Sequence, residues 1–324
     1  MDTQAHELLS KLRAGDRRAL ARLITLVEDR SPRVREVLSE IYSGREKIRT
    51  IGVTGPPGAG KSTLSDQLIA LLRGRQESVA VAAIDPSSPF TGGALLGDRI
   101  RMNRHATDPG VFIRSFGTRG SHGGLSHATR EVILLFAAAA FEWALVETVG
   151  VGQTELDIMD VADTTVVVLV PEAGDTVQTM KAGLTEIADI FVVNKADREG
   201  AHRMKGDLQL MVHLQEDAEW EIPVLLTQAN SGAGVPELLA KIEAHREMLS
   251  KSPRRAARRA ATLQAEFLEV VAEELGSRLA GALAEGPLAQ VARDLSSGKT
   301  NPYAAALEFL RDSKRIQEIL LKTR

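Results

Sequence analysis

Residues 55–62, with the sequence GPPGAGKS, constrain the fold of this chain more than any other segment. They match the phosphate-loop pattern G-x-x-x-x-G-K-[ST], and they lie between an apolar run at 51–54 and a helical pattern at 64–72. Glycines allow backbone amides to turn towards phosphate oxygens, and the N-terminus of the following helix adds positive partial charge. The segment therefore predicts a strand, a nucleotide-phosphate loop and a helix in succession.

The phosphate-loop pattern also predicts roles for individual residues. Lys61 is expected to bridge β- and γ-phosphate oxygens, and the hydroxyl of Ser62 is expected to ligate Mg²⁺. We also expect contacts to the nucleotide from Gly55, Gly58, Ala59 and Gly60 and from Thr63, which directly follows the segment.

Residues 194–197, with the sequence NKAD, indicate guanine recognition. The carboxylate of Asp197 accepts hydrogen bonds from both the ring N–H and the exocyclic amine of guanine, whereas adenine leaves it unpaired. Asn194 and Lys195 complete the motif at the end of an apolar run. Gln228 and Ala229 follow the last expected strand, where a backbone amide usually meets the guanine oxygen. GTP and GDP are therefore the expected nucleotides.

Carboxylates that follow two further strands are candidates for a Mg²⁺ site. Glu147 ends the run at 143–147, where it can hold Mg²⁺ directly or through water, and the amide of Gly150 is expected to meet the γ-phosphate. Val151 stands where Ras-like GTPases carry the glutamine that orients the attacking water, so slow unassisted hydrolysis is expected. Asp85 and Asp98 lie in a glycine-rich stretch suited to a switch, with loop capping as the alternative for each.

Short apolar runs alternate with helical stretches through the middle of the chain. Strands are expected at 50–54, 79–84, 111–114, 143–147, 165–170, 190–194 and 224–227. Nearly continuous apolar strands separated by helices are typical of a parallel sheet buried on both faces. We predict an α/β fold, a P-loop NTPase with a mostly parallel sheet flanked by helices, plus N- and C-terminal helical extensions.

Three regions that differ in their pattern of apolar residues predict the domain organisation. An N-terminal helical extension is expected at 1–45, a P-loop GTPase domain at 46–250 and a C-terminal helical arm at 251–324. Helix starts are expected at Asp16 and at Ser31, which precedes a proline. The arm should contain long helices at 254–281 and 302–322. Its apolar stripe must be buried somewhere, so we predict a homodimer held largely by the arm, with folding back on the nucleotide domain as the alternative. This stripe includes Leu263, Phe267, Val270 and Leu283.

Composition excludes several other classes of protein. The 324 residues include no cysteine, which excludes disulfides, thiolate metal sites and cysteine nucleophiles. Lys and Arg number 40 and Asp and Glu number 43, a balance that argues against a nucleic-acid partner. No apolar run approaches the ~20 residues that cross a bilayer, and residues 1–13 do not read as a signal peptide. We expect a soluble, cytoplasmic protein with no membrane partner.

Seven segments together resemble the MeaB/ArgK family, GTPases associated with methylmalonyl-CoA mutase and related to human MMAA. The segments are GPPGAGKST, DPSSPFTGGALLGDRIRM, TRGSHGGLSHATRE, ETVGVGQTE, PEAGDTVQTMKAG, NKAD and GKTNPYAAA. The resemblance covers nearly the whole chain. It implies a metallochaperone-type GTPase, usually a homodimer, that gates adenosylcobalamin delivery to an acyl-CoA mutase, protects the mutase and releases inactive cofactor.

The resemblance also implies site residues. It places Asp85, Asp98 and Glu147 around Mg²⁺ with Ser62. Residues 175–181 resemble the additional switch loop of the family, which couples the nucleotide to the mutase. The residues expected to take part in catalysis are Lys61, Asp98, Glu147, Asp175 and Lys181. The stretch at 227–229 departs from the usual T-S-A. No D-x-H-x-x-G motif is present, so the mutase that binds cobalamin is expected to be a separate chain.

Three alternative functions are each compatible with part of the sequence. A nickel-inserting GTPase is disfavoured because the chain lacks cysteine and its histidines are scattered. A protein kinase is disfavoured because no H-R-D or D-F-G segment is present and NKAD favours guanine. A nucleotide-switched binding module without meaningful turnover stays open, because the water-orienting glutamine is missing.

Overall fold

The computed structural model describes residues 3–85, 102–117, 124–148, 157–171, 187–213 and 219–321. The expectations for Asp98, Gly150, Val151, Asp175 and Lys181 lie outside these residues, and so does the side chain of Asp85. The chain divides into two compact units, Met1–Ser252 and Pro253–Arg324, which are described separately.

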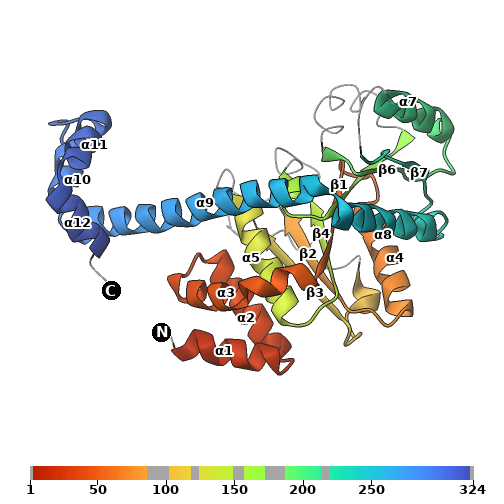
Figure 1. Cartoon of the computed structure of the whole chain (residues 1–324), viewed down its shortest axis with the longest axis horizontal. Coiled ribbons are helices and arrows are strands. Elements are labelled where there is room, and N and C mark those ends of the chain that lie inside the picture. The colour runs from red at the N-terminus through yellow and green to blue at the C-terminus, as the bar shows by residue number, and fades with distance from the viewer. Residues whose placement is uncertain are drawn as a thin grey trace. The chain divides into compact units, whose positions relative to one another are not determined.

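Seven parallel strands form a single sheet in the first unit (Figure 1). The strands are β1 (Arg49–Thr54), β2 (Val79–Asp85), β3 (Val111–Gly117), β4 (Trp143–Thr148), β5 (Thr164–Leu169), β6 (Ile190–Val193) and β7 (Val224–Leu226). Their order across the sheet is β3-β2-β4-β1-β5-β6-β7, and each neighbouring pair is parallel. The predicted α/β fold with a parallel sheet is confirmed, although β3 continues to Gly117, beyond the expected end at 114.

The first face of the sheet carries the N-terminal helices. These are α1 (Thr3–Arg13), α2 (Arg17–Glu28) and α3 (Arg35–Ile41), with the 3₁₀ turn η1 (Pro32–Val34) before α3 and the 3₁₀ turn η2 (Tyr42–Lys47) after it. They share one apolar core with α5 (Gly124–Ala138) and with alternate side chains of β2 and β4. Asp16 accepts hydrogen bonds from Arg18 N and Ala19 N, so it caps α2 as predicted. Ser31 caps η1 in the same way.

The opposite face of the sheet packs against α4 (Lys61–Gly74) and α8 (Val235–Lys251). Successive side chains of β5 point to opposite faces of the sheet and so belong to two different core clusters. Val166 and Val168 pack with α4 and α8, whereas Val167 and Leu169 pack in the cluster that contains α7 (Ala201–His213). Every residue of β4, β5 and β6 is buried, which explains why the strands read as continuous apolar runs.

The second unit is entirely helical in its described residues. It contains α9 (Pro253–Glu285), α10 (Ala289–Ser296), α11 (Pro302–Arg311) and α12 (Ser313–Leu321). The single helix expected at 302–322 is wrong, because the chain leaves helical geometry at Asp312, with φ −88° and ψ 83°. The carboxylate of Asp312 then accepts a hydrogen bond from Arg315 N and starts a new helix. None of the helices described has the length and apolar character needed to span a membrane.

Candidate functional site

The phosphate loop joins the central strand β1 to α4. Gly55 has φ 136°, and a Cβ atom there would lie 2.1 Å from the carbonyl oxygen of Val168. Gly60 has φ 90°, and its Cβ would lie 2.4 Å from Asn194 Nδ2. Both positions therefore require glycine, for backbone conformation and for space. The loop lies at the edge where the carboxyl ends of the parallel strands meet, which is where open α/β sheets bind ligands.

The side chain of Lys61 extends back towards the start of this loop. Its Nζ atom donates hydrogen bonds to the carbonyl oxygens of Gly55, at 2.7 Å, and Pro56, at 3.0 Å. The residue is buried although it carries a charge, and loop carbonyls offset part of the cost of that burial. An ammonium group in this position is directed at the loop that the sequence assigns to phosphate.

A hydroxyl and a carboxylate meet beside the loop. Ser62, in the first turn of α4, donates a hydrogen bond from Oγ to Glu147 Oε1 at 2.5 Å, and both residues are buried. Thr148 Oγ1 donates to Thr54 Oγ1 at 2.9 Å, so the ends of β4 and β1 are joined next to this pair. The structure thus brings together two of the residues expected at Mg²⁺.

The chemistry of this pair fits Mg²⁺. Hydroxyl and carboxylate oxygens are hard ligands, and Mg²⁺ at phosphate sites usually takes one or two protein ligands together with phosphate oxygens and waters. Within the described part of the chain, no group of three or more His, Cys, Asp or Glu side chains is placed to hold a metal ion. The Ser62–Glu147 pair therefore fits a metal that is shared with the phosphates of a bound nucleotide.

Asn194 connects three segments at the other end of the site. Its Nδ2 atom donates to the carbonyl oxygen of Ala59 at 2.8 Å. Its Oδ1 atom accepts from Thr227 Oγ1 and from Ala229 N, both at 3.1 Å. These contacts bracket Gln228, whose own N–H donates to the carbonyl oxygen of Ala233 at 3.0 Å. The departure from T-S-A therefore leaves this hydrogen-bonded arrangement of the loop in place.

A cavity of about 240 Å³ opens between these segments. Lys195 has φ 55° and donates from Nζ to the carbonyl oxygen of Gly58 at 2.8 Å, so its side chain crosses from the NKAD segment to the phosphate loop. Seven residues of the predicted nucleotide site line the cavity: Gly60, Thr63, Asn194, Lys195, Asp197, Gln228 and Ala229. The sequence reasoning missed Arg198, Asn230 and Ser231, which also line it. Their adjacency to the two motifs was the one available signal.

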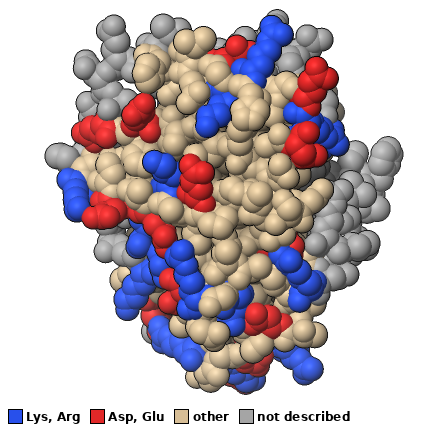
Figure 2. Space-filling model, turned by 90° about the vertical axis from the view of Figure 1, so that its right-hand side faces the viewer, with Lys and Arg blue, Asp and Glu red and all other residues tan. Residues whose placement is uncertain are grey.

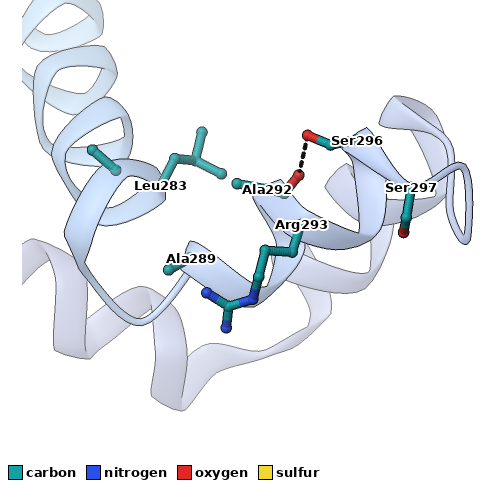
Figure 3. A pocket seen from close by; sticks show the side chains of 7 residues that line it. Leu283, Ala289, Ala292, Arg293, Ser296 and Ser297 are labelled. Carbon is teal, nitrogen blue, oxygen red and sulfur yellow. Dashed lines mark hydrogen bonds between the residues drawn. The ribbon is translucent and has the colours of Figure 1, made fainter.

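A larger cavity, of about 460 Å³, lies within the second unit between the end of α9 and α10 (Figure 3). Its serine hydroxyls are used inside the helical segment, because Ser296 donates to the carbonyl oxygen of Ala292 and Ser297 donates to that of Asp294. The guanidinium of Arg293 donates to Gln290 Oε1. The polar side chains of Arg293, Ser296 and Ser297 are thus paired within the helical segment itself.

The outer face formed by α4, α7 and α8 carries both signs of charge. Figure 2 shows basic and acidic side chains intermingled across it. Arg75, directly after α4, and Glu243 of α8 form one such pair, with Nη1 and Oε1 2.7 Å apart. Mixed charge of this kind is typical of an ordinary solvated surface.

The fold, the phosphate-loop sequence and the relatives of the chain define a P-loop GTPase. The chain belongs to the MeaB family, described as methylmalonyl-CoA mutase-associated GTPases, whose sequence model matches residues 20–284. A Pyrococcus abyssi protein named as a GTPase is 48% identical over 310 residues, which cover 94% of this chain and 96% of the relative. The mouse methylmalonic aciduria type A homolog is 33% identical over 271 residues, covering 78% of this chain and 65% of the mouse protein.

A solved structure also matches nearly the whole chain. The crystal structure of a LAO/AO transport system kinase superposes with a TM-score of 0.68 and 28% sequence identity, covering 96% of this chain and 98% of that protein. The resemblance to the MeaB family predicted from sequence is therefore confirmed by the family match, and the P-loop fold is confirmed by the structural one.

Proposed function

We propose that this GTPase is a chaperone of an adenosylcobalamin-dependent acyl-CoA mutase of the methylmalonyl-CoA type, gating cofactor delivery and protecting the mutase. The family match over residues 20–284 carries this proposal, because the family is described by its association with methylmalonyl-CoA mutase. The name of the mouse relative, which refers to methylmalonic aciduria, supports the same metabolic context. The mutase supplies the cobalamin site as a separate chain.

The phosphate end of the site has a defined division of roles in this proposal. Lys61 binds β- and γ-phosphate oxygens, and Ser62 and Glu147 hold Mg²⁺, with Asp85 and Asp98 as further carboxylates. Mg²⁺, when bound, offsets the negative charge that develops on the phosphates. Lys61 is held in place by hydrogen bonds to the carbonyls of the loop, and such preorganisation is what makes a charged group effective in a transition state.

The base end of the site selects guanine. Asp197 pairs with the two guanine donors, and the Asn194 network keeps the phosphate loop and the 227–229 loop at a fixed separation. Changing Asp197 to Asn should shift the preference from guanine to xanthine nucleotides, whose edge presents an acceptor in place of a donor. Calorimetry with GTP, XTP and ATP tests this, and equal affinity of the unaltered protein for ATP and GTP would contradict the base assignment.

Hydrolysis tests the phosphate assignment. Lys61→Ala and Ser62→Ala should abolish turnover while the protein stays folded, because both side chains serve phosphate and metal in this proposal. Glu147→Ala should weaken the Mg²⁺ dependence and leave GDP binding largely intact. Full turnover in Lys61→Ala would mean that the loop has only a structural role.

Partner coupling is the part of the proposal that separates a chaperone from a nucleotide-switched binding module. With Val151 in place of glutamine, basal hydrolysis is slow, and the mutase accelerates it through residues 175–181. The acceleration should be lost in Asp175→Ala and Lys181→Ala while basal turnover is nearly unchanged. Multiple-turnover rates with and without the mutase measure this. Variants that respond as fully as wild type would place the coupling elsewhere.

A pulldown experiment identifies the partner mutase. A pulldown from the native host, with and without a non-hydrolysable GTP analogue, should recover an acyl-CoA mutase in a nucleotide-dependent manner. Recovery of a hydrogenase or urease maturation complex would favour the metal-insertion alternative.

A homodimer held by the C-terminal helices is also part of the proposal. The helix α9 exposes large apolar side chains, among them Phe267 at 65% and Leu268 at 64% of their surface. Leu263, Val270 and Val271 on the same helix are at least one-third exposed. Apolar side chains spaced at three, four and seven residues form the stripe with which helices pair.

A further inference from the structure

Two buried hydroxyl groups, of Thr54 and Thr148, lie directly beside the phosphate site and have no role in the proposed function. Thr54 is the last residue of β1 and immediately precedes the phosphate loop, and Thr148 is the last residue of β4 and immediately follows Glu147. The two residues are 0% and 1% exposed. Thr148 Oγ1 donates a hydrogen bond to Thr54 Oγ1 at 2.9 Å. Because breaking a hydrogen bond between buried groups is costly, this pair holds the two strand ends together.

The hydroxyl pair follows directly after the backbone register of β1 and β4. In that register the last pair is Val53 opposite Glu147. One residue further along, the backbone of Thr54 pairs with β5 and the backbone of Thr148 pairs with β2, which are the strands on the outer sides of β1 and β4. The hydroxyl bond therefore joins β1 to β4 at the level where β1 gives way to the phosphate loop.

Six residues form a closed ring at the phosphate end of the site, in which hydrogen bonds alternate with peptide bonds. The three hydrogen bonds link the pairs Thr148–Thr54, Lys61–Gly55 and Ser62–Glu147. The three peptide bonds link residues 54 to 55, 61 to 62 and 147 to 148. The hydroxyl pair is the link of this ring whose side chains have no proposed contact with phosphate or Mg²⁺, so its effect on the site is through the other members.

We propose that Thr54 and Thr148 are positioning residues of the Mg²⁺ site, because their hydroxyl bond fixes Glu147 relative to the phosphate loop, where its carboxylate meets Ser62. This inference rests on the Mg²⁺ role proposed for Ser62 and Glu147. Groups that orient metal ligands without touching the metal have a strong effect on metal affinity, since a ligand that must first be ordered binds less tightly. Thr148 acts through the peptide bond that joins it to Glu147.

A buried threonine at the opposite edge of the sheet provides a matched control. Thr164 is the first residue of β5 and is 1% exposed, and its Oγ1 atom lies 2.9 Å from His245 Nδ1. It therefore matches Thr148 in burial and in hydrogen-bond distance. Val167, the residue of β5 opposite Thr54, lies three residues beyond Thr164, or about 10 Å along the strand. Thr164 is thus far from the phosphate loop.

The experiment compares Thr54→Val, Thr148→Val and the double variant with Thr164→Val, all in the full-length chain. Valine keeps the β-branched shape that suits a strand and removes only the hydroxyl group. The affinity for fluorescent GDP is measured in EDTA and against Mg²⁺ concentration, together with the thermal midpoint. The first three variants should raise the Mg²⁺ concentration for half-maximal effect by about tenfold and keep the wild-type affinity in EDTA. The double variant should be no worse than either single one, because one change already breaks the bond. Thr164→Val should lower the thermal midpoint and keep the wild-type Mg²⁺ dependence.

Two further variants separate positioning from stability and from the metal site itself. Thr148→Ser keeps the hydroxyl and loses a buried methyl group, so it should lower the thermal midpoint and keep the wild-type Mg²⁺ dependence. The positioning role is overturned if Thr148→Val changes the thermal midpoint alone, or if Thr164→Val shifts the Mg²⁺ dependence equally. Ser62→Ala, run alongside, tests the proposed metal site. An unchanged Mg²⁺ dependence in Ser62→Ala would refute that site, whereas a shift in Ser62→Ala without one in the Thr54 and Thr148 variants would refute the positioning role alone.

Discussion

Replacing Gly60 by alanine should destabilise the first unit much more than the same change at Gly58. Both glycines have positive φ, 90° and 76°, so an L-residue at either position pays a conformational penalty of about 1–2 kcal/mol. A Cβ at Gly58 meets nothing within 4 Å, whereas a Cβ at Gly60 lies 2.4 Å from Asn194 Nδ2. The methyl group must therefore displace Asn194.

The cost of that displacement follows from the contacts of Asn194. The side chain is buried and makes three hydrogen bonds, to Ala59, Thr227 and Ala229. Each is worth about 1 kcal/mol net, so Gly60→Ala should cost about 4–5 kcal/mol in total against about 1–2 for Gly58→Ala. In a background of Asn194→Ala, the cost of Gly60→Ala should fall to the conformational penalty alone, because the methyl group then has space.

Urea unfolding of the nucleotide-free protein measures this difference. The chain has two tryptophans, Trp143 and Trp220, and both belong to the unit Met1–Ser252, so their fluorescence reports the unit that carries the change. Equal losses of unfolding free energy in Gly58→Ala and Gly60→Ala would refute the reasoning. A cost of Gly60→Ala that is unchanged in the Asn194→Ala background would refute it as well.

Three other outcomes are expected. The hydrogen bonds from Arg73 are the main reason why the pKa of Asp108 lies below its ordinary value of 3.8. The ionised carboxylate of Asp108 therefore makes its full contribution to the free energy of unfolding above pH 3.8, and this contribution is lost as the pH falls through the lower pKa of the folded protein. Asp108→Asn should therefore lower the free energy of unfolding at pH 7 and flatten its decline below pH 4, and identical acid slopes in urea titrations would contradict this. Phe267→Asp on α9 should convert a dimer to a monomer in light scattering, whereas Leu210→Asp, at a position on α7 that is 71% exposed, should not. Asn301→Ala removes the cap that accepts from the first turn of α11 and should cost the helical unit about 1 kcal/mol, measured by loss of helical circular dichroism in urea.

The sequence predicted the sheet well because all seven strands are short apolar runs bounded by polar residues. Ser62, Glu147 and Asn194 lie at one edge of the sheet because each follows or ends such a strand, and parallel strands bring these ends together. The break at Asp312 was missed because the apolar spacing continues across it, while a single carboxylate decides where the second helix begins.

The contacts of Asp66 could not be predicted from the sequence around it. Its partners Arg104 and His105 are 38 and 39 residues away along the chain, and no motif joins them. Asp66 reads as an ordinary polar residue of an amphipathic helix until the fold places the distant segment against it. Arg198 and Ser231 were missed for a similar reason, since the wall of the cavity is formed by two loops that meet only in three dimensions.

The shared core of α1, α2, α3 and α5 has a consequence for biosynthesis. The first three helices end at residue 41, but α5, against which they pack, ends only at residue 138. At roughly 5–20 residues per second, about 5–20 seconds separate the emergence of the two parts from a ribosome. During that interval the apolar surface of α1–α3 that packs against α5 is not yet covered by it. The N-terminal region is thus made first and completed late, so nascent-chain chaperones should engage it until α5 has been translated.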